Sequence, residues 1–174
     1  PMSIHIIIDG YNLIRQSKSL SILDLQDIQL GRDTLVDMLA AYKKVKPHRI
    51  TVVFDGTTAP LFSQQRDRHK GISIIFSHKG ESADTVIKKM ARKERQKALV
   101  VSSDQDIVQS AAACSAATVS ANDFENKLTM SMDMDGLQFD RDDNIGWQPT
   151  TKKKGPSRRL PKRQRKNSAK IRKL

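Results

Sequence analysis

Short runs of apolar residues alternate along this chain with longer segments in which apolar residues recur at helical spacing. The first run, residues 4–8, contains four isoleucines and is followed at once by Asp9 and Gly10. An apolar run on consecutive residues is typical of a strand covered on both faces, as in the centre of a parallel sheet. The same pattern predicts five strands, at residues 4–8, 49–54, 72–76, 98–101 and 117–119.

Between these runs, the spacing of apolar residues predicts helices. In residues 28–44, apolar side chains such as Leu35 and Tyr42 recur at helical spacing, and Asp27 is a suitable N-cap. Ser82 is a second suitable N-cap, and the remaining helices are expected at residues 83–96, 105–114 and 122–130. Strands that alternate with helices predict one α/β domain with a mainly parallel sheet.

Basic residues are distributed unevenly along the chain. It has 31 Lys and Arg against 19 Asp and Glu, and twelve of the basic residues lie in residues 151–174, which contain no acidic residue. The formal net charge of +12 therefore arises from this segment. We expect residues 151–174 to form a disordered basic tail after an acidic flexible linker at residues 131–150. Polycations of this kind bind phosphate backbones or anionic membranes.

Composition narrows the class of protein further. A hydrophobic content of 37% over 174 residues is enough for one domain with a core. Cys114 is the single cysteine, which excludes an intramolecular disulfide and favours a reducing compartment. The chain shows neither a long apolar stretch nor a signal-peptide pattern. We therefore expect a soluble cytoplasmic protein without a membrane partner.

Several carboxylates follow predicted strands. Asp9, Asp55 and Asp104 each come directly or shortly after a strand, and Asp84 begins the helix after the third strand. Parallel strands end at one edge of the sheet, where α/β proteins bind ligands, so these side chains are expected to converge. Each also has a structural interpretation: Asp104 suits an N-cap, Asp84 suits a first helical turn, and Asp55 with Gly56 suits a turn.

Converging carboxylates repel one another unless a cation or a proton compensates. Oxygen ligands without cysteine or paired histidine favour Mg²⁺ or Mn²⁺ over zinc. A carboxylate cluster with such an ion is typical of phosphodiester hydrolysis, in which the ion activates water and stabilises the developing charge. The pattern therefore indicates a metal-dependent nuclease.

Four motifs resemble, in order and approximate spacing, those of the bacterial YacP-like NYN domains, a branch of the PIN-like nucleases. They are Ile8-Asp9-Gly10-Tyr11-Asn12, Val53-Phe54-Asp55-Gly56, Glu81-Ser82-Ala83-Asp84-Thr85-Val86-Ile87 and Val101-Ser102-Ser103-Asp104. The resemblance covers residues 3–130, and from about Ser131 the chain departs from the pattern. It implies a three-layer α/β/α PIN-like fold with a mainly parallel five-stranded sheet. It also implies a divalent-metal endoribonuclease, and some relatives act on ribosome-associated messages.

The resemblance also assigns site residues. Asp9, Asn12, Asp84 and Asp104 fall on the acidic and polar site positions of the family, and Asp106 lies where some relatives carry a further acid. We expect Asp9, Asp84 and Asp104 to hold one or two Mg²⁺ or Mn²⁺ ions. Asn12 is expected to orient a water or the phosphate. RNA is the expected partner, and the resemblance suggests the ribosome as a second one.

Two other functions are compatible with the sequence. The domain could be a catalytically weak PIN-like module that binds structured RNA or a ribosomal surface through its basic tail. Alternatively, Asp104 and Asp106 could form a Toprim-like phosphotransfer site, although that fold needs a Glu where Asp9 stands. A nuclease needs the three aspartates and a metal, whereas a binding module needs the Lys and Arg residues and tolerates Asp→Asn changes.

Overall fold

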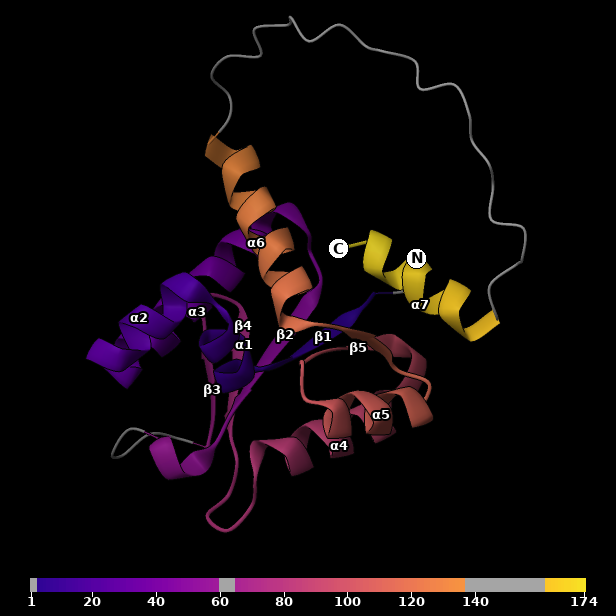
Figure 1. The fold of residues 1–174 in the computed structure, drawn as a ribbon, viewed down its shortest axis with the longest axis horizontal. Helices are drawn as coiled ribbons and strands as arrows, with labels where there is room; N and C mark the ends of the chain where they lie inside the picture. Colours follow the sequence, from indigo (N-terminus) through magenta and orange to yellow (C-terminus); the bar gives the residue numbers. More distant parts are fainter. Residues whose placement is uncertain (1–2, 60–64, 137–161) are drawn as a thin grey trace, which may run out of the picture.

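A six-stranded sheet forms the centre of the molecule, and five of its strands are parallel (Figure 1). The computed structural model describes residues 3–59, 65–136 and 162–174. The strand order is β3-β4-β2-β1-β5-β6. The parallel strands are the five predicted ones, namely β1 (His5–Asp9), β2 (Arg49–Phe54), β4 (Ile72–Phe76), β5 (Ala98–Val101) and β6 (Ala117–Val119).

The sixth strand, β3 (Arg66–His69), corrects the expected count of five. It pairs antiparallel with β4 at the edge of the sheet, in a segment for which no strand was predicted. All four of its residues are exposed, so it carries no apolar pattern, and charged side chains are usual on an edge strand. Lys70 and Gly71 both have positive φ, as a tight hairpin turn requires.

Helices cover both faces of the sheet and make the three layers that were predicted (Figure 1). One face carries α1 (Gly10–Gln16), α2 (Lys18–Gln26), α3 (Ile28–Val45) and α6 (Ala121–Gly136). The other carries α4 (Ala83–Glu94) and α5 (Gln105–Ala113), and two short 3₁₀ helices, η1 (Gly56–Thr58) and η2 (Arg95–Lys97), lie in loops.

Successive isoleucines of β1 pack against the helices on alternate faces of the sheet. Ile6 and Ile8 pack with the first group of helices, whereas Ile7 packs with α4 and α5. The predicted caps are confirmed, because Asp27 accepts a hydrogen bond from the backbone N–H of Gln29 and Ser82 accepts one from Thr85. None of the helices that the structure describes is long and apolar enough to span a bilayer.

The C-terminal segment differs from the expectation. The expectation that residues 151–174 are disordered is wrong for residues 162–174, because α7 (Lys162–Arg172) forms a helix beside the edge strand β6. The Asn167 amide accepts from the N–H of Thr118 at 2.9 Å and donates to its carbonyl oxygen at 3.4 Å. Leu174 is buried, and its carbonyl oxygen accepts a hydrogen bond from the Tyr42 hydroxyl at 2.9 Å.

The expected linker is only partly described. α6 continues through Gly136, beyond the expected end at residue 130, and Ser131 is buried. Residues 137–161, which include most of the acidic linker and the first part of the basic tail, lie outside the described residues.

Replacing Asn167 with alanine tests whether α7 is an integral part of the fold. The change removes both hydrogen bonds to Thr118 and leaves the N–H of an edge strand without its partner, so the free energy of unfolding should fall by about 1–3 kcal/mol. Urea unfolding measures this. The matched control is Gln164→Ala, an exposed position of the same helix, which should change stability by less than about 0.5 kcal/mol. Equal stabilities of the two variants would contradict the docking of α7.

Candidate active site

The candidate site lies where the strand order of the sheet reverses. β1 lies between β2 and β5 in the sheet. The strands that follow β1 in the sequence first add to the sheet on the side of β2, and β5 and β6 are then added on the other side. Crevices at the carboxyl ends of strands next to such a reversal are the usual ligand sites of α/β proteins. Asp9 is the last residue of β1 and therefore stands at this point.

Asp9 is a buried carboxylate, with 8% of its surface exposed. Its Oδ2 atom accepts a hydrogen bond from the Ser102 hydroxyl at 3.2 Å. Burial raises the pKa of Asp9 to about 6, and the negative charges of Asp84 and Asp104 add to the effect, while hydrogen bonds from Ser102 and the Asn12 backbone oppose it. The sequence thus places a carboxylate where ionisation is costly.

Asp84 and Asp104 enter the same region from two helix N-termini. Asp84 lies in the first turn of α4, and burial together with the charge of Asp104 raises its pKa, against the effect of Lys88. Asp104 is the N-cap of α5, and its Oδ1 atom accepts from the N–H of Asp106 at 2.9 Å. The predicted cap and the predicted convergence therefore coexist, because one carboxylate can serve both.

Asn12 is fixed between α1 and the loop after β5. Its Oδ1 atom accepts a hydrogen bond from the backbone N–H of Ser103 at 2.8 Å. With the oxygen engaged in this way, the side-chain amide offers its NH₂ group as a donor. This is the group that could contact a phosphate oxygen or a water molecule.

Asp106 has a different environment from the other three aspartates. Its Oδ2 atom forms a short ion pair with the ammonium group of Lys88. Hydrogen bonding to Asp106 raises the pKa of Lys88, and the charges of Asp84 and Asp104 raise it further. Asp106 thus carries its own counter-charge, whereas Asp9 forms no ion pair with the residues that the structure describes.

Sequence reasoning missed two residues of this site. Lys88 lies one helical turn after Asp84, a spacing that favours contact between opposite charges and could have indicated it. Ser102 is fully buried and bridges two site residues, since its hydroxyl donates to Asp9 and accepts from the N–H of Asp104 at 3.1 Å. No sequence signal identifies Ser102, because its role depends on side-chain direction at the end of β5.

Asp55 stabilises a turn, as its sequence context predicted. Its Oδ1 atom accepts from the N–H of Thr57 at 2.9 Å and from the Thr57 hydroxyl at 2.8 Å. Gly56 then passes so close to the loop after β4 that a Cβ atom there would lie 1.8 Å from the carbonyl oxygen of Ser77. The charge of Asp55 still contributes to the raised pKa of Asp84.

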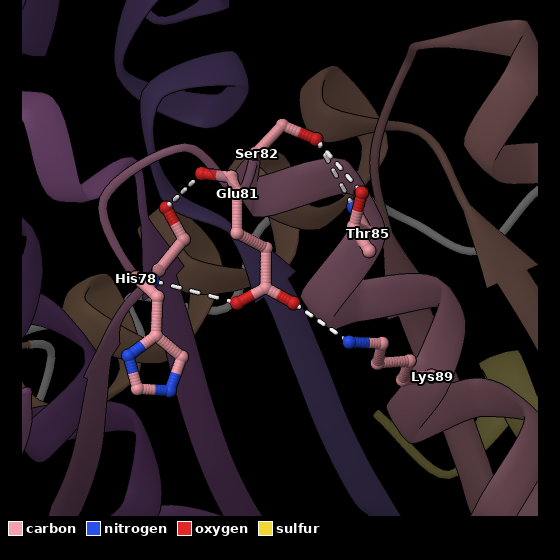
Figure 2. A network of polar contacts seen from close by, with 6 residues as sticks. His78, Glu81, Ser82, Thr85 and Lys89 are labelled. Carbon is pink, nitrogen blue, oxygen red and sulfur yellow. Dashed lines mark hydrogen bonds and ion pairs between the residues drawn. The ribbon is translucent and has the colours of Figure 1, made fainter.

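The loop before α4 is held by a polar network that Figure 2 shows. Glu81 accepts from Lys89 at 2.8 Å and from the N–H of His78 at 3.4 Å, and the lysine lowers the pKa of Glu81. Ser82 caps the helix through the N–H of Thr85 at 3.3 Å. Because Asp84 follows directly, the network fixes the start of α4 and hence the place of that carboxylate.

The candidate ligand atoms are of the type that a hard divalent cation binds. They are carboxylate oxygens, and the negative charges of Asp84 and Asp104 raise the pKa of Asp9, which is the arrangement that a cation relieves. Within the part of the chain that the structure describes, no three His, Cys, Asp or Glu side chains stand close enough to form a complete ion site. Mg²⁺ does not require one, because it commonly keeps several waters and binds one or two carboxylates directly.

Comparisons with known proteins show which family and which fold the chain shares. The family model of the YacP-like NYN domain matches residues 6–173. YacP of Bacillus subtilis (strain 168) is 30% identical over 87 residues, which are 50% of this chain and 51% of that protein. The match therefore spans about half the length of this curated relative.

Two crystal structures of Rae1 (YacP) from Bacillus subtilis have the same fold. One superposes with a TM-score of 0.65 at 26% identity and covers 78% of each chain. The other, of a mutant form of Rae1, gives a TM-score of 0.64 at 24% identity, over 75% of this chain and 78% of that one.

The family match also corrects the expected departure from the pattern near Ser131. The matched segment continues through residue 173 and thus includes α7, which packs on the same domain. With a match over nearly its whole length and the fold of the Rae1 structures, the chain belongs to the YacP-like NYN domain family, within the PIN-like nucleases.

Proposed function

We propose that this protein is a divalent-metal-dependent endoribonuclease that acts at the edge of the sheet marked by Asp9. The observation that carries the proposal is the buried carboxylate of Asp9 at the end of the central strand, where burial and the charges of Asp84 and Asp104 raise its pKa. Carboxylates kept in such an unfavourable setting are typical of functional sites. Membership of a nuclease family supports phosphodiester bonds as the target, and RNA is the substrate that we propose.

Asp9, Asp84 and Asp104 would hold Mg²⁺ or Mn²⁺, partly through water. A bound ion of this type supplies an activated water and stabilises the charge that develops on the phosphate. The chain's own residues provide the rest: Ser102 orients Asp9, and the Asn12 amide donates to the phosphate or to the attacking water. Asp106 holds Lys88 beside the carboxylates, where its ammonium group can offset negative charge. Association with the ribosome stays a prediction that rests on the resemblance alone.

The pKa of Asp9 makes stability depend on pH in a defined direction. Because the pKa is about 6 in the folded chain against an ordinary value of 3.8, the folded state binds more protons between these values. The free energy of unfolding should therefore fall through this group as the pH rises from about 4 to about 6. Asp9→Asn cannot ionise, so it should be more stable than the wild type above that window, by up to about 2–3 kcal/mol.

Urea unfolding of both proteins across the pH range measures the difference, which should vanish below about pH 4. Mg²⁺ at neutral pH should stabilise the wild type more than Asp9→Asn. The control is Asp37→Asn, an exposed carboxylate on α3 that pairs with Lys70 at 2.8 Å, away from the Asp9 site. Parallel pH profiles for wild type and Asp9→Asn would contradict the assignment of the pKa.

Cleavage of a labelled, partly structured RNA tests the proposed activity directly. Wild type and Asp37→Asn should cleave with Mg²⁺ or Mn²⁺ and stop with chelator, whereas Asp84→Asn and Asp104→Asn should lose at least about 100-fold in kcat. Asparagine is as good an N-cap as aspartate, so the second variant should keep α5 intact. RNA binding by all four proteins without cleavage by any of them would instead support the non-catalytic RNA-binding module.

A further inference from the structure

The edge of the sheet opposite Asp9 carries a concentration of positive charge. We name this surface the basic edge and define it by Arg49, Lys93, Lys97, Lys170 and Lys173. Arg49 begins β2, Lys93 lies in the last turn of α4, and Lys97 ends η2. These three residues line one surface pocket of about 400 Å³, together with Ser3, Ile4, His5 and Glu94.

The acidic residue of this pocket is already engaged. Glu94 lies 2.5 Å from Nδ1 of His5 and 3.8 Å from Arg49. Burial lowers the pKa of His5, so its ring is neutral at physiological pH, donates from Nδ1 to Glu94 and accepts at Nε2 from the Thr51 hydroxyl at 2.7 Å. The carboxylate of Glu94 is thus occupied by His5 and Arg49.

The two lysines of the pocket have no acidic partner in the described part of the chain. Lys93 and Lys97 are exposed, and neither forms an ion pair with any carboxylate among the described residues. An exposed pocket with uncompensated cations and one internally paired acid attracts anions.

Helix α7 extends the same surface. The ammonium group of Lys170 donates to the carbonyl oxygen of Gln96, directly beside Lys97. The ring of His48, next to Arg49, lies 3.0 Å from the carbonyl oxygen of Lys173. The end of α7 and the residue after it therefore contact the neighbours of two pocket residues, Lys97 and Arg49, and Figure 1 shows the helix near the N-terminal end of β1.

The cations of α7 and of Lys173, which follows it, lie close to one another. Lys166, Lys170 and Lys173 recur at the spacing of one helical face, and the segment 162–174 has no acidic residue. Burial lowers the pKa of Lys170, and the positive charges of Lys166 and Lys173 lower it further. A folded surface that keeps repelling cations together is stabilised by a polyanion that neutralises several of them at once.

We propose that the basic edge binds the phosphodiester backbone of an RNA segment remote from the bond that is cut. The proposal relies on the proposed function only in taking RNA as the polyanion. His5 and Asp9 stand at opposite ends of β1, four residues or about 13 Å apart along the strand. The RNA must therefore pass along the side of the domain to reach both edges, and the basic edge supplies affinity rather than chemistry.

The test compares two double variants. Lys93→Gln with Lys97→Gln removes two cations of the basic edge, and Lys18→Gln with Lys127→Gln removes two cations from α2 and α6, on the other face of the sheet. Binding to a structured RNA is measured at several salt concentrations, each time on the Asp104→Asn background so that no cleavage intervenes. Circular dichroism confirms that both fold.

The basic-edge variant should bind at least about 10-fold more weakly at low salt, and its slope of log K against log salt should fall by about 2. The control should bind within about twofold of the parent. In proteins with Asp104 intact, the basic-edge changes should raise KM for the long RNA without changing kcat. They should not affect a short RNA that cannot reach from Asp9 to the basic edge.

Equal losses in the two double variants, no loss in either, or no RNA binding by the parent would each overturn the proposal. Weaker binding to phosphatidylserine vesicles with unchanged RNA binding would also overturn it, because the surface would then be a membrane contact. Failure of the proposed function gives a different result. If the wild type cleaves no RNA, the binding comparison between the two double variants still decides this inference.

Discussion

The buried carboxylate of Asp9 is the constraint on which the site depends. It ends the central strand, whose Ile6, Ile7 and Ile8 are fully buried, so the carboxylate is carried into a poorly hydrated position by the core itself. Its hydrogen bonds with Ser102 and the Asn12 backbone only partly compensate for burial, which is why its pKa stays near 6. Asp84 and Asp104 bring further negative charge to this edge of the sheet, where burial already disfavours the ionised form of Asp9.

The parts of the fold that the sequence predicted are those whose burial follows a simple period. The five parallel strands lie between two layers of helices and therefore appear in the sequence as apolar runs. By contrast, β3 is wholly exposed, and in α2 only Leu20 is buried, so neither element carries a period that sequence reasoning could detect. In residues 162–174 the abundance of basic residues concealed the amide of Asn167 in α7 and the buried Leu174 after it, which attach this segment to the rest of the domain.

The site likewise has parts that the sequence predicted and parts that it did not. Asp9 and Asp104 were predictable because parallel strands end at one edge, and Asp84 because a cap at Ser82 fixed the start of its helix. The bridge through Ser102 and the pairing of Lys88 with Asp106 were not, since both depend on side-chain directions across different elements. A sequence places residues on an edge, whereas contacts between them require the packed structure.

Helix α4 connects the two oppositely charged edges, with Asp84 in its first turn and Lys93 in its last. The helix dipole favours this order of charges, because the N-terminus attracts anions and the C-terminus attracts cations. The dipole alone would therefore account for Lys93. It does not account for Arg49, Lys97 or the lysines of α7, which lie outside α4 and increase the repulsion at the same edge. The excess positive charge there is a property of the whole surface, and a polyanionic partner is the simplest physical reason for it.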